Sequence, residues 1–178
     1  MISPEDYEFL GDLLKRNSGL SLGAGKEYLI ESRLPSVVAM FGHSSISTLV
    51  QSLRIHAPAN IVKSVCDAMT TGETLFFREA APFTVLKQQV LPAALSRVRE
   101  ARRPLRILCA ACSTGQEPFS IAMILAQMEQ ELQDTRVEIV ATDFSAHALA
   151  RAKDGIYNHF EVQRGHPVQH LVKFFRPV

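Results

Sequence analysis

The residues best suited to chemistry lie between positions 107 and 143. Residues 107–120 run from an apolar stretch through a turn of small residues into a helix start that carries Glu117. Such a turn lets a ligand approach the backbone, and the helix start offers it free N–H groups. Asp143 ends a second apolar stretch, and a carboxylate there can accept two hydrogen bonds from the vicinal hydroxyls of a ribose. The pattern predicts a cofactor site.

The composition of the loop restricts the cofactor. The loop has one glycine, Gly115, so it lacks G-x-G-x-x-G, and it has no G-K-[ST]. A pyrophosphate cradle is therefore disfavoured, and a cofactor with a ribose and an amino-acid tail fits better, with Glu117 accepting hydrogen bonds from the ammonium group. Two other interpretations stay open: Glu117 as an ordinary first-turn acid, and Asp143 as the cap of a helix that begins at Ala146.

The elements that must position these residues follow from the apolar pattern. Buried strands are expected over 105–110 and 137–143, and helices over 81–102, from the loop to 133, over 146–153 and, as a fragment, over 166–175. This alternation predicts a parallel α/β sheet with helices on its faces, whose ligands lie beyond the carboxyl ends of the strands.

The first seventy residues instead predict a small all-helical bundle. Ser3 and Pro4 begin a helix that Gly19 ends. A second helix is expected over 26–41, with a kink or break at Pro35. Two more short helices are expected over 45–55 and 58–69.

The overall composition is that of an ordinary globular protein. The chain has 178 residues, 47% of them hydrophobic and 21% charged, and a net charge of +1 gives no reason to expect nucleic acid or an anionic membrane as partner. There is no signal-peptide pattern and no apolar stretch of membrane-spanning length. Three cysteines fit a reducing compartment. We therefore expect a soluble cytoplasmic protein.

Two local features each allow two interpretations. An arginine run follows the helix over 81–102 and is either a solvated helix end or a docking patch; it comprises Arg97, Arg99, Arg102, Arg103 and Arg106. Cys109 and Cys112 form a C-x-x-C that is either a redox or metal pair or, as we favour, two small packing residues. We expect no metal site.

Three motifs, in order, resemble one known family. Thr70-Thr71-x-x-Thr74-x-Phe76-Phe77-Arg78-Glu79 is similar to the signature segment of the chemoreceptor glutamate methyltransferases of the CheR type. Cys112-Ser-Thr-Gly-x-Glu-Pro-x-Ser120 and Ala141-Thr-Asp143 resemble the S-adenosylmethionine motifs of that family, and the helical opening resembles its N-terminal domain. The resemblance covers nearly the whole chain. It implies a helical N-terminal domain (1–70), a motif segment with a linker helix (71–103), and the first half of a Rossmann-like methyltransferase domain with an incomplete parallel sheet (104–178).

The resemblance also implies a function. Such an enzyme moves a methyl group from S-adenosylmethionine, leaving S-adenosylhomocysteine, to glutamates on the helical cytoplasmic part of chemoreceptors. By family match the cofactor-binding residues are Thr74, Arg78, Glu117, Asp143 and Phe144. Arg78 is also the candidate catalytic residue, because guanidinium offers a planar fork of donors to a carboxylate; the other interpretation of Arg78 is a surface partner of Glu73 or Glu79. Phe76 and Phe77 are expected to be core anchors.

The sequence departs from the family in places. Gly72 stands where relatives usually have Asn, Gln116 replaces a frequent Glu, and Ser36-Val37-Val38 lacks basic residues that relatives often carry. Two strands alone leave an exposed apolar edge. We therefore expect either a fragment of a longer protein or copies that associate, for instance by exchanging elements. The alternatives to the methyltransferase of receptors are a non-catalytic binding or assembly module and, more weakly, a small-molecule methyltransferase.

Overall fold

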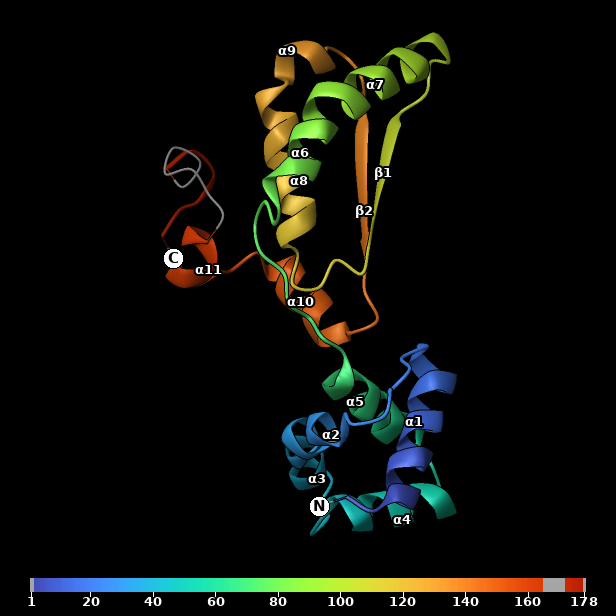
Figure 1. The fold of residues 1–178 in the computed structure, drawn as a ribbon. Coiled ribbons are helices and arrows are strands. Elements are labelled where there is room, and N and C mark those ends of the chain that lie inside the picture. The colour runs from blue at the N-terminus through green and yellow to red at the C-terminus, as the bar shows by residue number, and fades with distance from the viewer. Residues whose placement is uncertain (1, 165–171, 178) are drawn as a thin grey trace. The chain divides into compact units, whose positions relative to one another are not determined.

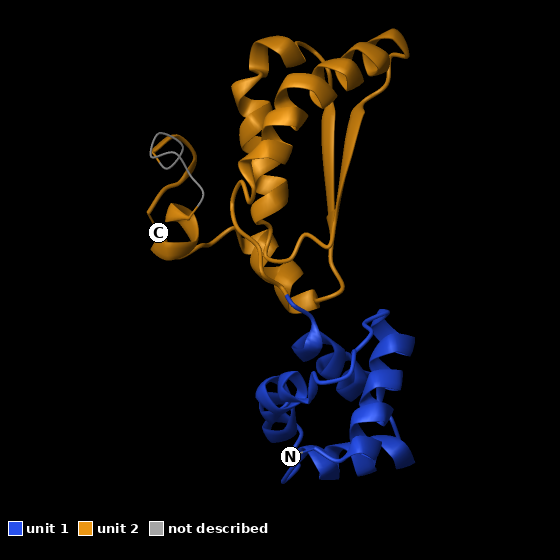
Figure 2. Ribbon diagram, viewed as in Figure 1, with its two compact units in different colours: residues 1–71 blue, residues 72–178 orange. Residues whose placement is uncertain are grey.

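The computed structural model describes residues 2–164 and 172–177, which form two compact units over 1–71 and 72–178 (Figure 2). Each unit has its own core. Unit 1 contains five helices and unit 2 the sheet, and we describe each by itself. No described helix is both long and apolar enough to cross a bilayer.

Unit 1 is the predicted helical bundle. Its helices are α1 (Pro4–Ser18), α2 (Glu27–Arg33), α3 (Pro35–Met40), α4 (Ile46–Ile55) and α5 (Ala59–Met69). Ser3 caps α1 by accepting a hydrogen bond from the N–H of Asp6, and Gly19 ends it in the left-handed conformation. Pro35 breaks the expected helix over 26–41 into two, because it begins α3 as a first-turn proline.

The bundle closes around a core of aliphatic side chains. The fully buried members include Leu10, Leu14, Ile30, Leu34, Leu49 and Val65. Arg33 ties α2 to the end of α5, since its Nη1 donates to the carbonyl of Met69 at 2.7 Å. Arg33 is thus part of the bundle's own hydrogen bonding.

The first helical stretch of unit 2 is continuous and lies close to the range expected, 81–102. It consists of α6 (Ala80–Val85), the π-helical η1 (Leu86–Val90) and α7 (Leu91–Glu100). Pro92 is the second residue of α7, two positions after the end of η1. Proline cannot donate to the carbonyl four residues before it and collides with it, so the widened turn accommodates Pro92 without a break.

The sheet of the described chain has two parallel strands, β1 (Leu105–Ala110) and β2 (Val137–Thr142), paired from Leu105↔Val137 to Ala110↔Thr142. The remaining helices are α8 (Gln116–Gln127), α9 (Glu129–Leu132), α10 (Ala146–Asp154) and α11 (His159–Gln163). Helices α6, α7 and α8 lie on the same side of the strands (Figure 1). The predicted fold class, a helical domain followed by parallel α/β structure of the Rossmann-like kind, is confirmed.

Three sequence expectations need correction. The helix expected up to residue 133 is interrupted at Met128. The strand over 137–143 is not buried: its last three residues, from Val140, are exposed, because within the described residues no further strand or helix covers its second face. Most of the helix fragment expected over 166–175 lies outside the described residues; of 172–177, residues 172–174 are helical. The sequence analysis did not predict α11.

Candidate functional site

The loop between β1 and α8 has an unusual backbone. Ala111, Ser113 and Gly115 have φ angles of 58°, 50° and 98°, so three of five consecutive residues are left-handed. A Cβ atom on Gly115 would lie 2.9 Å from both the Cβ of Ala152 and the hydroxyl of Tyr157. Only glycine fits there. The tight turn places the loop's backbone and the free N–H groups of α8 at the carboxyl end of β1.

Asp143 joins this loop to the end of β2. Its Oδ2 accepts a hydrogen bond from the N–H of Ser113 at 2.7 Å, and its Oδ1 accepts one from the N–H of Ser145 at 2.8 Å. The interpretation of Asp143 as the cap of α10 is wrong, since the Ser145 side chain caps that helix through the N–H of Ala148. Each carboxylate oxygen keeps a second lone pair. Asp143 can therefore accept further hydrogen bonds from a diol.

Glu117 lies in the first turn of α8 and is exposed. It also contacts the buried thiol of Cys109. Burial raises the pKa of Cys109 to about 11, and the charge of Glu117 and its hydrogen bond to the thiol add to the effect. Cys109 and Cys112 are both buried free cysteines, so the structure supports a packing role for this C-x-x-C.

The segment that carries Thr74 and Arg78 is held against the loop and α8 by two hydroxyl groups. Ser113 Oγ donates to the carbonyl of Gly72 at 2.7 Å, and the N–H of Phe77 donates to Ser120 Oγ at 2.9 Å. These bonds join positions about forty residues apart along the chain. The structure thus places the segment beside the loop.

Within the segment, Thr74 is half-buried and Arg78 is exposed. Arg78 Nη1 donates to the main-chain carbonyl of Glu73 at 2.9 Å, which closes the turn. Arg78 is thus a partner of Glu73, but the bond is to the main-chain carbonyl of Glu73. Phe144, next to Asp143, is 44% exposed, so its ring presents an apolar surface at the end of β2.

Phe76 and Phe77 anchor the segment, as predicted. Phe76 is completely buried and packs edge-on against Tyr157 and Phe175, with ring centroids 5.0 and 5.3 Å apart. Phe77 packs against Phe83 of α6 at 5.3 Å. The Phe76 ring is therefore not free to stack on a cofactor, and the Phe77 ring is half-buried against α6.

Tyr157 holds the loop between β1 and α8 through a hydrogen bond, a role that the sequence analysis did not predict. Its hydroxyl donates to the carbonyl of Thr114 at 2.6 Å, and burial raises its pKa to about 12. The sequence analysis included Ser120 in a motif but gave it no role, although a serine on the buried face of a predicted helix is itself a signal of a required hydrogen bond.

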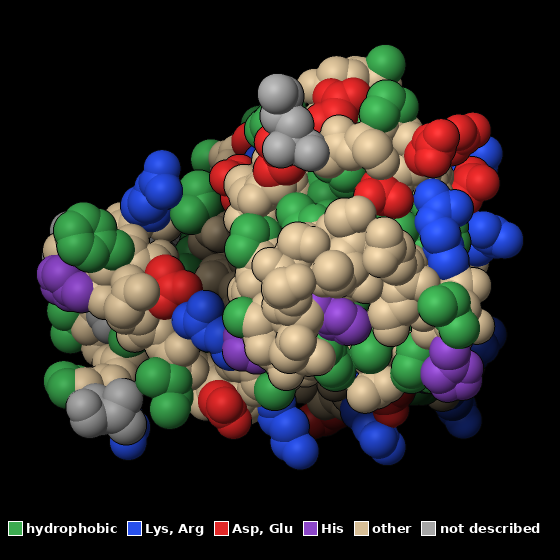
Figure 3. Space-filling view, turned by 90° about the horizontal axis from the view of Figure 1, so that it is seen from below, with side chains coloured by type: hydrophobic (Ala, Val, Ile, Leu, Met, Phe, Trp, Pro, Cys, Tyr) green, Lys and Arg blue, Asp and Glu red, His purple; other side chains and the backbone are tan. Residues whose placement is uncertain are grey.

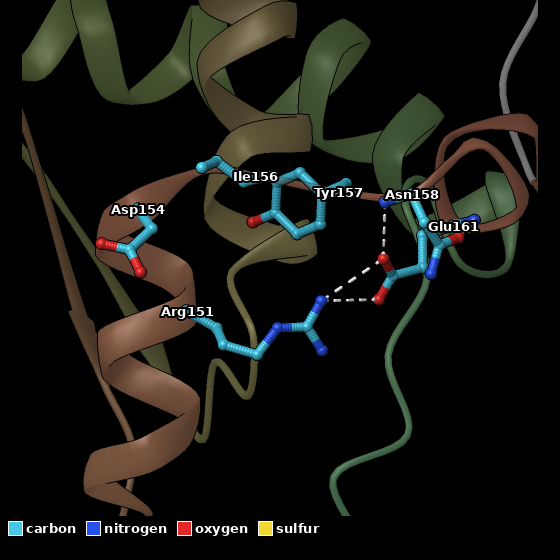
Figure 4. A pocket seen from close by; sticks show the side chains of 6 residues that line it. All are labelled: Arg151, Asp154, Ile156, Tyr157, Asn158 and Glu161. Atoms are coloured by element: carbon cyan, nitrogen blue, oxygen red, sulfur yellow. Dashed lines mark hydrogen bonds and ion pairs between the residues drawn. The ribbon is translucent and has the colours of Figure 1, made fainter. Parts of the chain in front are cut away.

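A pocket of about 380 Å³ lies beside Tyr157 (Figure 4). Its charged groups already serve the fold: Arg151 Nη2 donates to both carboxylate oxygens of Glu161, at 3.1 and 3.3 Å, and Glu161 also accepts from the N–H of Asn158 at 2.9 Å. This network fixes the start of α11 to α10. We therefore interpret the residues that line the pocket as structural: they hold α10 and α11 together, and Tyr157 among them holds the loop.

Comparison with known proteins gives the same family for both units. Residues 5–70 match the model described as "CheR methyltransferase, all-alpha domain", and residues 72–177 match "CheR methyltransferase, SAM binding domain".

Individual relatives are similar along most of the chain. "Chemotaxis protein methyltransferase 1" of Pseudomonas aeruginosa is 40% identical over 173 residues, which is 96% of this chain and 62% of that protein. "Chemotaxis protein methyltransferase" of Vibrio anguillarum is 40% identical over 92% of this chain and 59% of its own length, and that of Borreliella burgdorferi is 32% identical over 88% and 56%. The chain spans about three fifths of the length of these curated relatives. The two domain matches, in this order and across nearly all of the sequence, establish that the chain belongs to the CheR methyltransferase family.

Proposed function

We propose that this chain carries the S-adenosylmethionine-binding corner of an enzyme that methylates glutamate side chains of chemoreceptors in the cytoplasm. The observation that carries the proposal is the arrangement of Asp143 and the loop around Gly115 at the carboxyl ends of the two strands, which we call the cofactor corner. Asp143 fastens a glycine-requiring turn to the end of β2 in a domain whose family is described by its binding of S-adenosylmethionine. The relatives' printed names, chemotaxis protein methyltransferases, support the choice of reaction.

The residues present fit such a cofactor. Asp143 has lone pairs left for the ribose hydroxyls, and Phe144 offers an exposed ring beside it for the adenine. Glu117, exposed at the start of α8, accepts hydrogen bonds from the methionine ammonium. Thr74 and Arg78 lie on the segment that Ser113 and Ser120 hold in place, and they approach the reacting centre.

Methyl transfer from a sulfonium to a carboxylate makes modest demands on the protein. The bound cofactor supplies an electrophilic methyl group and a neutral leaving sulfur. A glutamate side chain is already ionised near neutral pH, so no residue of this chain has to remove a proton. The remaining tasks are to align the carboxylate and to exclude water. Arg78 suits the first task, because only one of its guanidinium nitrogens is engaged by the Glu73 carbonyl.

Cofactor binding can be tested by calorimetry on this chain with S-adenosylhomocysteine. We expect binding that Asp143→Ala and Glu117→Ala each weaken by about tenfold or more, the loss of one or two hydrogen bonds to a charged group. Glu8→Ala, which removes an exposed acid from α1, is the matched control and leaves binding unchanged. Equal affinity for all four proteins would contradict the proposed site.

The substrate is tested separately. The receptor's helical cytoplasmic fragment, labelled methyl donor and this chain should yield base-labile methyl esters, and Arg78→Ala should slow their formation at saturating cofactor. Transfer to small carboxylic acids but not to the fragment would favour a small-molecule methyltransferase. Cofactor binding without any transfer would favour the non-catalytic alternative for this chain.

The uncovered face of the sheet favours a second role, self-association. Leu108 and Val140 are paired in register on that face and are 67% and 41% exposed. A second copy could cover them. Sedimentation velocity should then show a dimer that Leu108→Lys dissociates and that Ile55→Lys, at an exposed position of α4, does not. A wild-type monomer at every concentration would exclude this role.

A further inference from the structure

A second polar hollow lies at the opposite end of the strands from Asp143. It has a volume of about 460 Å³ and is formed by the end of α7, the start of β1 and the connection from α9 to β2. Four arginines line it against a single acid, Asp134; they are Arg99, Arg102, Arg103 and Arg136. A strand of six residues is about 20 Å long, so this hollow is separate from the cofactor corner.

The backbone at the end of α7 presents two of these arginines beyond the helix. Arg102 has a φ of 50°, and the N–H of Arg103 reaches back to the carbonyl of Val98 at 2.8 Å. This is the position after a helix end where glycine, or sometimes asparagine, is usual. Arg102 therefore occupies a position whose backbone geometry disfavours any residue with a Cβ atom.

The four arginines are not equally engaged. Arg99 donates to Thr135 Oγ1 at 3.1 Å and to the carbonyl of Glu131, and so ties α7 to α9. Arg136 pairs with Glu138 at 3.0 Å, a carboxylate that Arg106 shares. Among residues 2–164 and 172–177, no ion pair or hydrogen bond engages the guanidinium groups of Arg102 and Arg103. A solvated helix end explains Arg97 and Arg99, but not two unengaged arginines past the end.

The charge lining the arginine hollow also differs from that of the face seen in Figure 3. On the face in Figure 3, basic, acidic and hydrophobic side chains are intermixed. In the arginine hollow a cationic lining surrounds a space of the size that small ligands occupy in proteins. Guanidinium groups match phosphate oxygens with paired, charge-assisted hydrogen bonds.

We propose that the arginine hollow binds a small anion with two or more linked phosphate groups, held mainly by Arg102 and Arg103. The linked phosphates spread their charge over the hollow, so that they face both of these arginines and Arg136 together. Because the hollow is open to solvent, its affinity falls as salt rises. Free polyphosphate and a nucleotide share this chemistry.

Titration calorimetry of the full chain with inorganic pyrophosphate and, separately, adenosine triphosphate tests the proposal and distinguishes the two sources. Binding of both with equal affinity identifies the phosphates as the ligand, and tighter binding of the nucleotide adds a contact to the nucleoside. Arg102→Ala with Arg103→Ala should weaken both by about tenfold or more. Arg16→Ala with Arg164→Ala removes the same charge from exposed positions elsewhere and should leave binding within twofold.

Arg102→Gly guards against a folding defect, because glycine suits a positive φ. We expect a Tm that is unchanged or higher together with weaker pyrophosphate binding. Saturating S-adenosylhomocysteine should not displace pyrophosphate, which separates this site from the cofactor corner. The proposal is overturned if pyrophosphate does not bind, if both double variants weaken it equally, or if only an acidic peptide binds.

Discussion

The N–H of Ser113 donates a 2.7 Å hydrogen bond to Oδ2 of Asp143, which fastens the loop after β1 to the end of β2. The other oxygen of the same carboxylate accepts from Ser145 at the start of α10. One side chain thus sets the spacing of the loop, the strand end and the next helix. The cofactor corner is therefore a property of the fold before any ligand arrives.

We expect Asp143→Asn to lower both the stability and the cofactor affinity. An asparagine side chain has one acceptor oxygen, so one of the two backbone N–H groups loses its partner, and the charge is lost as well. The free energy of unfolding should fall by about 2 kcal/mol, and S-adenosylhomocysteine should bind at least about tenfold more weakly. Urea denaturation and calorimetry measure the two effects. Asp12→Asn, at an exposed position of α1, changes the charge equally and should alter neither quantity.

Replacing two glycines by alanine should change the free energy of unfolding in opposite directions. Gly115→Ala adds a Cβ at a φ of 98°, 2.9 Å from the Cβ of Ala152, and should cost more than about 2 kcal/mol of unfolding free energy. Gly11→Ala lies inside α1 with nothing within 4 Å of the added atom, and should raise that free energy by about 0.5–1 kcal/mol. Denaturant titration of both variants is the measurement. A neutral Gly115→Ala would mean that the loop is not held as described.

Local signals were sufficient to predict most elements from the sequence. Ser3 and Pro35 locate helix starts, and the strand expected over 105–110 is observed as Leu105–Ala110. The Asn158–Glu161 capping box, a local signal as well, would have identified α11. A two-stranded sheet was expected to leave an apolar edge exposed, but the exposure of the last three residues of β2 was not predicted, because burial of a strand depends on neighbours that its own residues do not encode.

The candidate site was predictable in its residue types but not in its connections. A carboxylate at the end of an apolar stretch indicates a site, yet nothing local links Asp143 to an N–H thirty residues earlier. Tyr157 is a similar case: its partner, the Thr114 carbonyl, is 43 positions away. Such contacts depend on the tertiary fold, and they cannot be predicted from the spacing of apolar residues along the chain.

Tyr157→Phe should loosen the loop with little change to the core. The ring still packs against Phe76, but the 2.6 Å hydrogen bond to the Thr114 carbonyl is lost. We expect about 1 kcal/mol lower unfolding free energy and a measurably weaker affinity for S-adenosylhomocysteine. Tyr28→Phe, at a side chain that is 61% exposed, is the control. If the two variants bind the ligand equally well, Tyr157 does not position the loop.

The stability of unit 2 should fall between pH 9 and pH 12. Burial raises the pKa of Cys109 from 9.0 to about 11 and that of Tyr157 from 10.0 to about 12. Between each pair of values the unfolded chain has released a proton that the folded chain retains, so raising the pH favours unfolding. The contribution of each group is complete below its unfolded pKa and is lost as the pH rises through the folded one.

Urea denaturation at pH 8 and pH 10.5 should therefore give a lower unfolding free energy at the higher pH. Cys109→Ala removes one of the buried groups of unit 2 whose pKa is raised, which also include Cys112, and should make the decrease smaller, whatever it costs in packing. Cys66→Ala is the matched control for the unfolding transition of unit 2, because Cys66 is a buried cysteine of unit 1 and its own raised pKa affects the stability of unit 1. If Cys109→Ala leaves the decrease unchanged, the Cys109 thiol does not carry the pH dependence assigned to it.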